Sequence, residues 1–257
     1  MKKHLTLIMA AALMLLSPSI CSAQMRLYTK KARMDDFTTK TTKVVASGQD
    51  MIALAIQEEI RSRWHVSPYE FCSMADYERL KEDNNYYFLL LEKEDGIIFL
   101  NLSKGGKEKD PDKKKTPFEV VRIPVIPEDN ASGVGFTFIG PAVDVIQQFA
   151  LDAMESDRVG YTGLKAYKGG KLRGKTVILD PEKAEEALAA SAMDTVAGVV
   201  IAPSIVSFRS NCYKMLVTTD THELVYYISE RYSNPSQKTF SEKEANFFSK
   251  KHGNVVR

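Results

Sequence analysis

The chain has 257 residues, and its 35 lysines and arginines against 33 aspartates and glutamates give a net charge of +2. The first 23 residues contain two lysines and no acidic residue, so their removal would leave a neutral chain. Nucleic-acid binding proteins need a strong basic excess to neutralise phosphates, so this charge balance argues against a nucleic-acid partner.

Residues 1–23 have the pattern of a secretory signal peptide. A lysine pair precedes an apolar run at residues 5–16, and small residues at 21–23 provide a cleavage site before Gln24. An alternative is a lipid anchor on Cys21, although Ile20 is bulkier than the residue that usually precedes a lipidated cysteine. No later segment is long and apolar enough to span a bilayer. We therefore expect an exported chain, periplasmic or extracellular.

After the signal peptide, the expected order is a flexible lead-in at 24–38 and a first α/β lobe at 39–128. In that lobe, we expect a strand at 39–46, a capping box at 47–50 and a helix with an apolar stripe that ends near Trp64. A short strand at 66–71 and a helix at 74–81, capped by Ser73, should follow. The apolar run at 86–91 predicts a buried strand, and antiparallel strands are expected at 97–102 and 118–126.

A connector at 129–138 precedes a second lobe at 139–252 and a tail at 253–257. This lobe repeats the order of the first: a helix at 141–154, a strand at 175–179, a short helix capped by Asp180 and a buried strand at 196–202. A hairpin at 213–231 and a final helix with a capping box at Ser241 complete it. The sequence thus predicts an α/β fold with mixed sheets, flanking helices and two similarly ordered halves, a possible structural repeat.

The unit at residues 50–91 resembles the amino-terminal domain of TolB-type and curli-secretion-type envelope proteins in its order of helix, strand, capped short helix and buried strand. The signal peptide ending at Ala23 and the overall style also resemble secreted proteins of unknown function from Bacteroidetes-type bacteria. These resemblances imply an envelope location and a non-enzymatic interaction role, and they carry no catalytic residues.

Residues 169–176, GGKLRGKT, match the spelling of a phosphate-binding loop, with Lys175 and Thr176 at its end. That chemistry requires a strand before the loop and a helix after it. The β-branched run that begins at Thr176 predicts a strand instead. We therefore expect a glycine turn here, and nucleotide binding at 169–176 is the disfavoured alternative. No motif in the chain predicts a cofactor.

Asp220, His222 and Glu223 lie within four residues and are candidate metal ligands. They also fall between two strand-like runs, where turn-forming residues favour a solvated hairpin tip. We expect the turn and keep a metal site as the alternative.

Cys72 and Cys212 remain after removal of the signal peptide, and export would allow a disulfide between them. Alternatively, both are buried thiols. Cys72 precedes a helix, so a cysteine-dependent hydrolase that uses Cys72 with His65 or His222 is a third possibility.

The expected function is an exported, non-enzymatic envelope binding or assembly protein whose partner is another envelope protein or a polysaccharide. We expect the lysine-rich loop at 104–115 to be a solvated hairpin loop, and a weak contact with polysaccharide or anionic lipid headgroups is the alternative.

Overall fold

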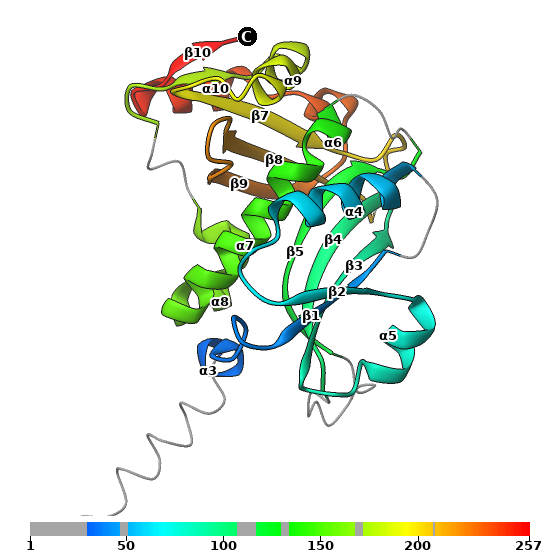
Figure 1. Cartoon of the computed structure of the whole chain (residues 1–257). Helices are drawn as coiled ribbons and strands as arrows, with labels where there is room; N and C mark the ends of the chain where they lie inside the picture. Colours follow the sequence, from blue (N-terminus) through cyan, green and yellow to red (C-terminus); the bar gives the residue numbers. More distant parts are fainter. Residues whose placement is uncertain (1–29, 47–50, 107–116, 130–133, 168–171, 208) are drawn as a thin grey trace, which may run out of the picture.

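The computed structural model describes residues 30–46, 51–106, 117–129, 134–167, 172–207 and 209–257. Within these ranges the chain forms two mixed five-stranded sheets with flanking helices, which confirms the predicted α/β class and the similar order of the two halves. In Figure 1 the second sheet lies above the first, and the long helix α7 (Ile139–Glu155) runs between them.

The first sheet has the order β2-β1-β3-β4-β5. Its strands are β1 (Thr41–Val45), β2 (Tyr69–Cys72), β3 (Tyr86–Glu94), β4 (Ile97–Lys104) and β5 (Phe118–Pro127). Strand β1 pairs in parallel with β2 and β3, and the β3–β4–β5 pairs are antiparallel. Helix α4 (Met51–Arg63) joins β1 to β2, and α5 (Met74–Leu80) joins β2 to β3. The predicted cap of α5 is confirmed as a capping box between Ser73 and Asp76. The box predicted at 47–50 lies outside the described residues.

The second sheet has the order β10-β6-β7-β8-β9. Its strands are β6 (Thr176–Ile178), β7 (Thr195–Ile201), β8 (Asn211–Thr218), β9 (Leu224–Arg231) and β10 (Asn254–Val256). Strand β6 pairs in parallel with β7 and β10, whereas β7–β8 and β8–β9 are antiparallel. Helix α9 (Pro181–Ala189) begins at its predicted cap, Asp180. The short 3-10 turn η2 (Pro235–Lys238) precedes α10 (Glu242–Lys250), which begins at the predicted capping box of Ser241.

Three segments expected to be irregular contain regular structure. The lead-in at 24–38 includes helix α3 (Lys30–Met34), and Met34 and Phe37 are buried in the core. The connector at 129–138 includes α6 (Val134–Thr137). The tail at 253–257 includes β10, whose backbone pairs with β6 at the edge of the second sheet. Each of these elements has five residues or fewer, so its place depends on distant partners more than on its own sequence.

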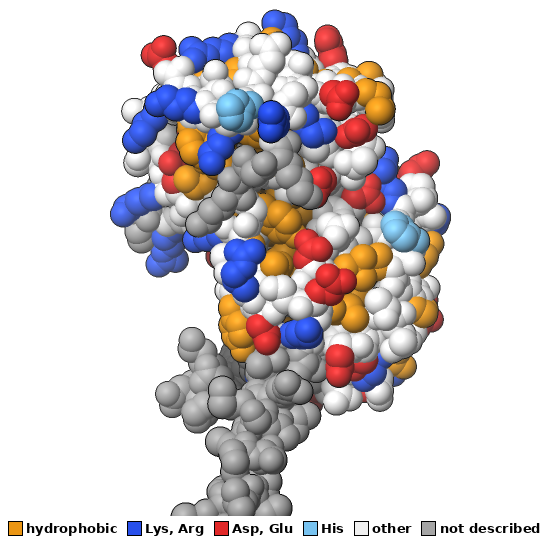
Figure 2. All heavy atoms as spheres, turned by 90° about the vertical axis from the view of Figure 1, so that its left-hand side faces the viewer, with side chains coloured by type: hydrophobic (Ala, Val, Ile, Leu, Met, Phe, Trp, Pro, Cys, Tyr) orange, Lys and Arg blue, Asp and Glu red, His pale blue; other side chains and the backbone are white. Residues whose placement is uncertain are grey.

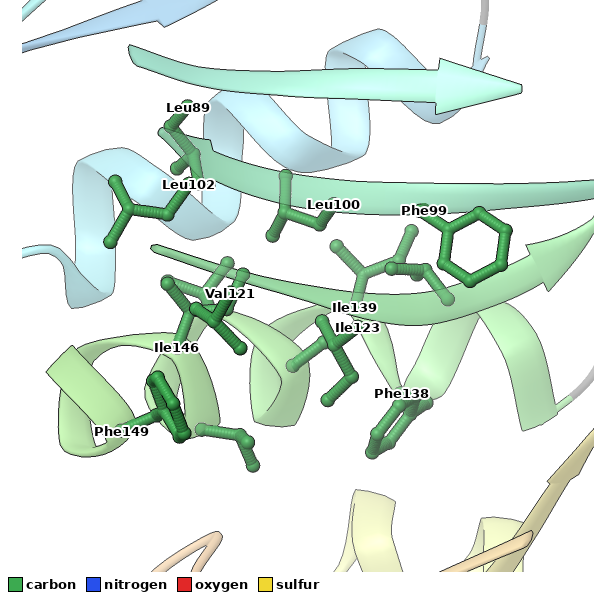
Figure 3. Packing of buried hydrophobic residues seen from close by; sticks show 14 of the residues in the cluster. Leu89, Phe99, Leu100, Leu102, Val121, Ile123, Phe138, Ile139, Ile146 and Phe149 are labelled. Atoms are coloured by element: carbon green, nitrogen blue, oxygen red, sulfur yellow. The ribbon is translucent and has the colours of Figure 1, made fainter. Parts of the chain in front are cut away.

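The core is continuous between the two halves. Helix α7, followed by α8 (Asp157–Thr162) and the turn η1 (Gly163–Ala166), packs on the first sheet. Figure 3 shows its side chains against β4 and β5, with Leu100, Leu102, Val121 and Ile123 near Ile139, Ile146 and Phe149. The same cluster includes Ala197 and Val199 of β7 and Met215 of β8. Each large apolar side chain buried here stabilises the fold by about 1.5–3 kcal/mol. Helix α7, expected in the second lobe, thus packs on the first sheet and shares this cluster with the second.

Among the described helices, none has both the length and the apolar character needed to cross a bilayer.

Candidate functional site

A polar pocket lies where the two halves meet α7. Its volume is about 520 Å³. Its wall consists of His65 and Val66 after α4, Asp144, Gln147, Gln148 and Leu151 of α7, and Thr221, His222 and Glu223 of the β8–β9 hairpin. Three segments that are distant in the chain therefore contribute polar side chains to one concave surface, which is a common arrangement for ligand sites.

The β8–β9 turn holds His222 in an uncommon backbone conformation. Its φ angle is +54°, in the left-handed region that few residues other than glycine adopt, although histidine is among those that do. The backbone N–H of His222 donates to the carbonyl of Thr218 (3.0 Å), and the N–H of Glu223 donates to the Thr218 hydroxyl (2.8 Å). These bonds fix the turn so that the imidazole points back toward the molecule and is only 10% exposed.

His222 binds Asp144, a charged residue within a largely apolar helix. The Nδ1 atom of His222 lies 2.7 Å from Asp144 Oδ2. Arg63 Nη1 donates to the same oxygen at 3.0 Å, and Gln147 Nε2 donates to Oδ1 at 3.2 Å. The Asp144 carboxylate therefore joins the end of α4, the middle of α7 and the β8–β9 hairpin.

Gly140 allows α4 to approach α7 at this point. A Cβ atom at Gly140 would lie 2.6 Å from Glu59 Oε2 and 2.8 Å from Arg63 Nε, which is too close for any side chain without a shift of the neighbours. Glu59 and Arg63 form an ion pair within α4, and Arg63 reaches Asp144 one turn further along α7. The glycine thus positions the arginine behind the pocket wall.

His65 is fixed by two further bonds at the end of α4. Its backbone N–H donates to Gln147 Oε1 (2.9 Å), and its Nδ1 lies 2.6 Å from the carbonyl oxygen of Arg63. Gln147 Nε2 also donates to that carbonyl (3.1 Å), and Gln147 itself is 3% exposed. Both candidate histidines, 157 positions apart, therefore line one pocket.

Cys72 lies elsewhere. It packs against the buried cluster of Val45, Phe88 and Leu90, on the face of the first sheet that α5 covers. It is absent from the pocket wall, and the charged groups that affect it are Lys43, Asp76 and Glu70. Burial raises the pKa of the Cys72 thiol, which works against a nucleophilic thiolate. The pairing of Cys72 with His65 or His222 is thus not formed.

The two cysteines are free thiols, so the disulfide alternative does not apply to this structure. Cys212 is completely buried in β8, and its Sγ–H donates to the carbonyl of Gln237 (3.2 Å). Burial raises the pKa of Cys212 to about 12. Cys212 matches the buried-thiol interpretation, whereas Cys72 is only partly buried.

The expected solvated tip at 220–223 is wrong for His222, because its side chain turns inward to Asp144. Within the described ranges, no three His, Cys, Asp or Glu residues form a group that could hold a metal ion. Asp220 instead accepts the backbone N–H of Thr221 (2.9 Å), a bond typical of turns.

The phosphate-loop match does not form a phosphate site in its described part. Gly174 has a φ angle of +77°, as a glycine turn requires, and Thr176 begins β6. The backbone N–H groups of Gly174, Lys175 and Thr176 donate to carbonyl oxygens of the chain, so they are not available to phosphate oxygens. Residues 168–171 lie outside the described ranges, as do 107–116 of the lysine-rich loop.

Comparisons with family models, curated proteins and solved structures found no match. The site must therefore be interpreted from its own geometry. Sequence reasoning found His65 and His222 but missed Asp144 and Gln147. The available signal was the group of three polar residues Asp144, Gln147 and Gln148 within an otherwise apolar central stretch of α7.

Proposed function

We propose that this protein is an exported, non-enzymatic binding protein of the cell envelope, and that its ligand binds in the pocket between the two halves. The observation that carries this proposal is the pocket wall itself, to which both halves and α7 contribute polar side chains. Hydrogen bonds to the scaffold hold His65, His222 and Gln147 in place, whereas side chains on surface loops are seldom fixed in this way.

Export is supported by the amino-terminal sequence, and the envelope role by the resemblance of residues 50–91 to envelope proteins. The mature chain should begin at Gln24, which intact mass measurement of the secreted protein would check. An acylated species that begins at Cys21 would instead establish a lipoprotein.

Binding is favoured over catalysis because the pocket lacks an activated nucleophile. An aspartate–histidine pair is the base of many hydrolases, but those enzymes also place a hydroxyl or thiol within reach of the histidine. Here the one hydroxyl in the wall, Thr221, hydrogen-bonds Thr218 at 2.8 Å. Cys72 lies against a different face of the first sheet.

The proposal is tested by blocking the pocket. Leu151 lies in the wall and is partly buried, so Leu151→Trp should fill part of the space. Leu54 of α4 is 52% exposed, and Leu54→Trp is the matched control. The mature wild-type chain and both variants are mixed with the sugar, peptide and lipid-headgroup fractions of hydrolysed envelopes, and their thermal unfolding is measured.

We expect one fraction to raise the melting temperature of the wild type and of Leu54→Trp but not of Leu151→Trp, because ligand binding stabilises the folded state. An equal shift in Leu151→Trp would place the binding site elsewhere. No shift with any fraction would refute a small-ligand binding role.

A further inference from the structure

The hydrogen bonds of the pocket wall fix which atoms remain for a ligand. A backbone carbonyl oxygen only accepts, so the 2.6 Å contact between His65 Nδ1 and the Arg63 carbonyl places the proton on Nδ1. In the neutral imidazole, Nε2 then carries a lone pair. Among the described residues, Nε2 of His65 has no hydrogen-bond partner, so it is an available acceptor.

The same reasoning applies to His222. Its Nδ1 lies 2.7 Å from Asp144 Oδ2 and 3.4 Å from Arg63 Nη1. The carboxylate cannot donate and the guanidinium cannot accept, so the shorter contact decides that Nδ1 carries the proton and donates to Asp144. In the neutral imidazole, Nε2 of His222 carries a lone pair that has no partner within the described part of the chain, so it is a second acceptor.

The two glutamines add one acceptor and one donor. Gln147 uses its oxygen for the backbone N–H of His65 and its nitrogen for the Arg63 carbonyl and Asp144. Gln148 Nε2 donates one of its two N–H groups to Asp152 Oδ1 at 2.8 Å, which leaves the second N–H and the amide oxygen Oε1 of Gln148. The wall therefore offers mainly acceptors to a ligand.

The charges of the wall point the same way. Asp144 and Glu223 are carboxylates, and no lysine or arginine is among the residues that line the pocket. Arg63 stands behind Asp144 and is shared with Glu59, so one positive charge faces two negative ones. In Figure 2 acidic and basic side chains both lie on the surface where the upper and lower parts of the molecule meet.

We propose that the ligand of this pocket carries a primary ammonium group, as amino sugars and lysine side chains do; this rests on the proposed binding function. An ammonium group brings three N–H donors and no acceptor. Those donors complement the Nε2 atoms of His65 and His222 and the amide oxygen of Gln148, while its charge complements Glu223. An anionic ligand would find no lysine or arginine among the residues that line this wall.

The test compares probes that differ in one group. Glucosamine carries the ammonium, N-acetylglucosamine and glucose are neutral, and glucuronate is an anion on the same ring. Nα-acetyl-lysine amide presents the ammonium on a peptide side chain. Binding to the mature chain is followed by NMR, with long-range proton–nitrogen spectra that report the histidine tautomers directly.

We expect both histidines to carry the proton on Nδ1, and we expect an ammonium probe to bind at least about tenfold more tightly than its neutral partner. The ammonium probe that binds more tightly then indicates whether the ammonium belongs to an amino sugar or to a peptide. Glu223→Gln should weaken ammonium binding about two- to fivefold, while Asp220→Asn, on the same hairpin but outside the wall, should leave it unchanged.

Three results would overturn the inference: equal affinity for glucose and glucosamine, preference for glucuronate, or protons on Nε2. Shifts of both imidazoles by Zn²⁺ without any response to the ammonium probes would instead make the pocket a metal site. If an envelope fraction still raises the melting temperature of the wild type but not of Leu151→Trp in these cases, the binding function stands and only the ammonium assignment fails.

Discussion

The most direct test of the site is the removal of Asp144, because this carboxylate joins three segments. It accepts hydrogen bonds from His222 (2.7 Å), Arg63 (3.0 Å) and Gln147 (3.2 Å). Its side chain is 22% exposed and that of His222 is 10% exposed, so water cannot fully replace the lost partner. Asp144→Ala leaves the Nδ1–H of His222 without an acceptor, whereas Arg63 keeps Glu59.

The expected loss can be estimated from these three bonds. A hydrogen bond to a charged group contributes about 1.5–3 kcal/mol when buried, and partial exposure lowers that value. Because Arg63 retains a partner, most of the loss comes from His222, and we expect a loss of about 2 kcal/mol in the free energy of unfolding. For a chain of this size, that corresponds to a fall in melting temperature of about 4–8 °C.

A double-mutant cycle separates the pair from its surroundings. Urea unfolding of Asp144→Ala, His222→Ala and the double variant should give a coupling energy of at least about 1 kcal/mol, because the two side chains are in direct contact. The control cycle pairs Asp144→Ala with Asp220→Ala, on the same hairpin but without a bond to Asp144, and should be additive within about 0.5 kcal/mol. A coupling energy near zero for Asp144 and His222 would refute the claim that this bond holds the hairpin against α7.

Three further predictions concern other parts of the molecule. Burial raises the pKa of Glu244, but hydrogen bonds from Lys214 and Ser241 outweigh it and keep that pKa below its usual 4.5. The hydrogen bonds to the ionised carboxylate therefore stabilise the folded state above pH 4.5. In urea unfolding, the stability should fall as the pH drops below 4.5, and it should fall less steeply in Glu244→Gln. At neutral pH a thiol reagent should modify Cys72 slowly and Cys212 only after unfolding, because burial raises the pKa of both; a disulfide in the native mass would contradict this. Deletion of 254–257 removes β10 and its hydrogen bonds to β6, and should lower the unfolding free energy by about 2–4 kcal/mol, whereas an irregular tail would be lost without effect.

Much of the fold was predictable because its signals are local. The caps at Ser73, Asp180 and Ser241 are formed by side chains within three residues of the helix start, so the sequence alone contains both partners. The buried strands β3 and β7 were predicted from apolar runs that fit a strand covered on both faces. Strand β10 was missed because three residues carry too little pattern, and only the edge of β6 gives them a partner.

The site was less predictable because its bonds are not local. Asp144 and His222 are 78 positions apart, and no residue near His222 in the sequence indicates that its side chain turns inward. Local reasoning favoured a solvated tip, since the turn residues around it are those of any exposed hairpin. The packing of α7 against both halves overrides that preference. The polar residues Asp144, Gln147 and Gln148 in the centre of a largely apolar helix were the indication available from sequence.

The place of the pocket is related to a difference between the two halves in how their outer parallel strands are connected. Their sheets pair alike, but the outer parallel strand of the first sheet, β2, follows β1 through α4, whereas its counterpart β10 comes last in the chain. A simple tandem duplication would preserve that connection, so a duplicated origin would also require one helix–strand unit to have moved. The role of α7 therefore differs from that of α4, because α7 leads from one sheet to the other and packs against both halves. Because α7 carries Asp144, Gln147 and Gln148, the pocket lies on the element that connects the two halves.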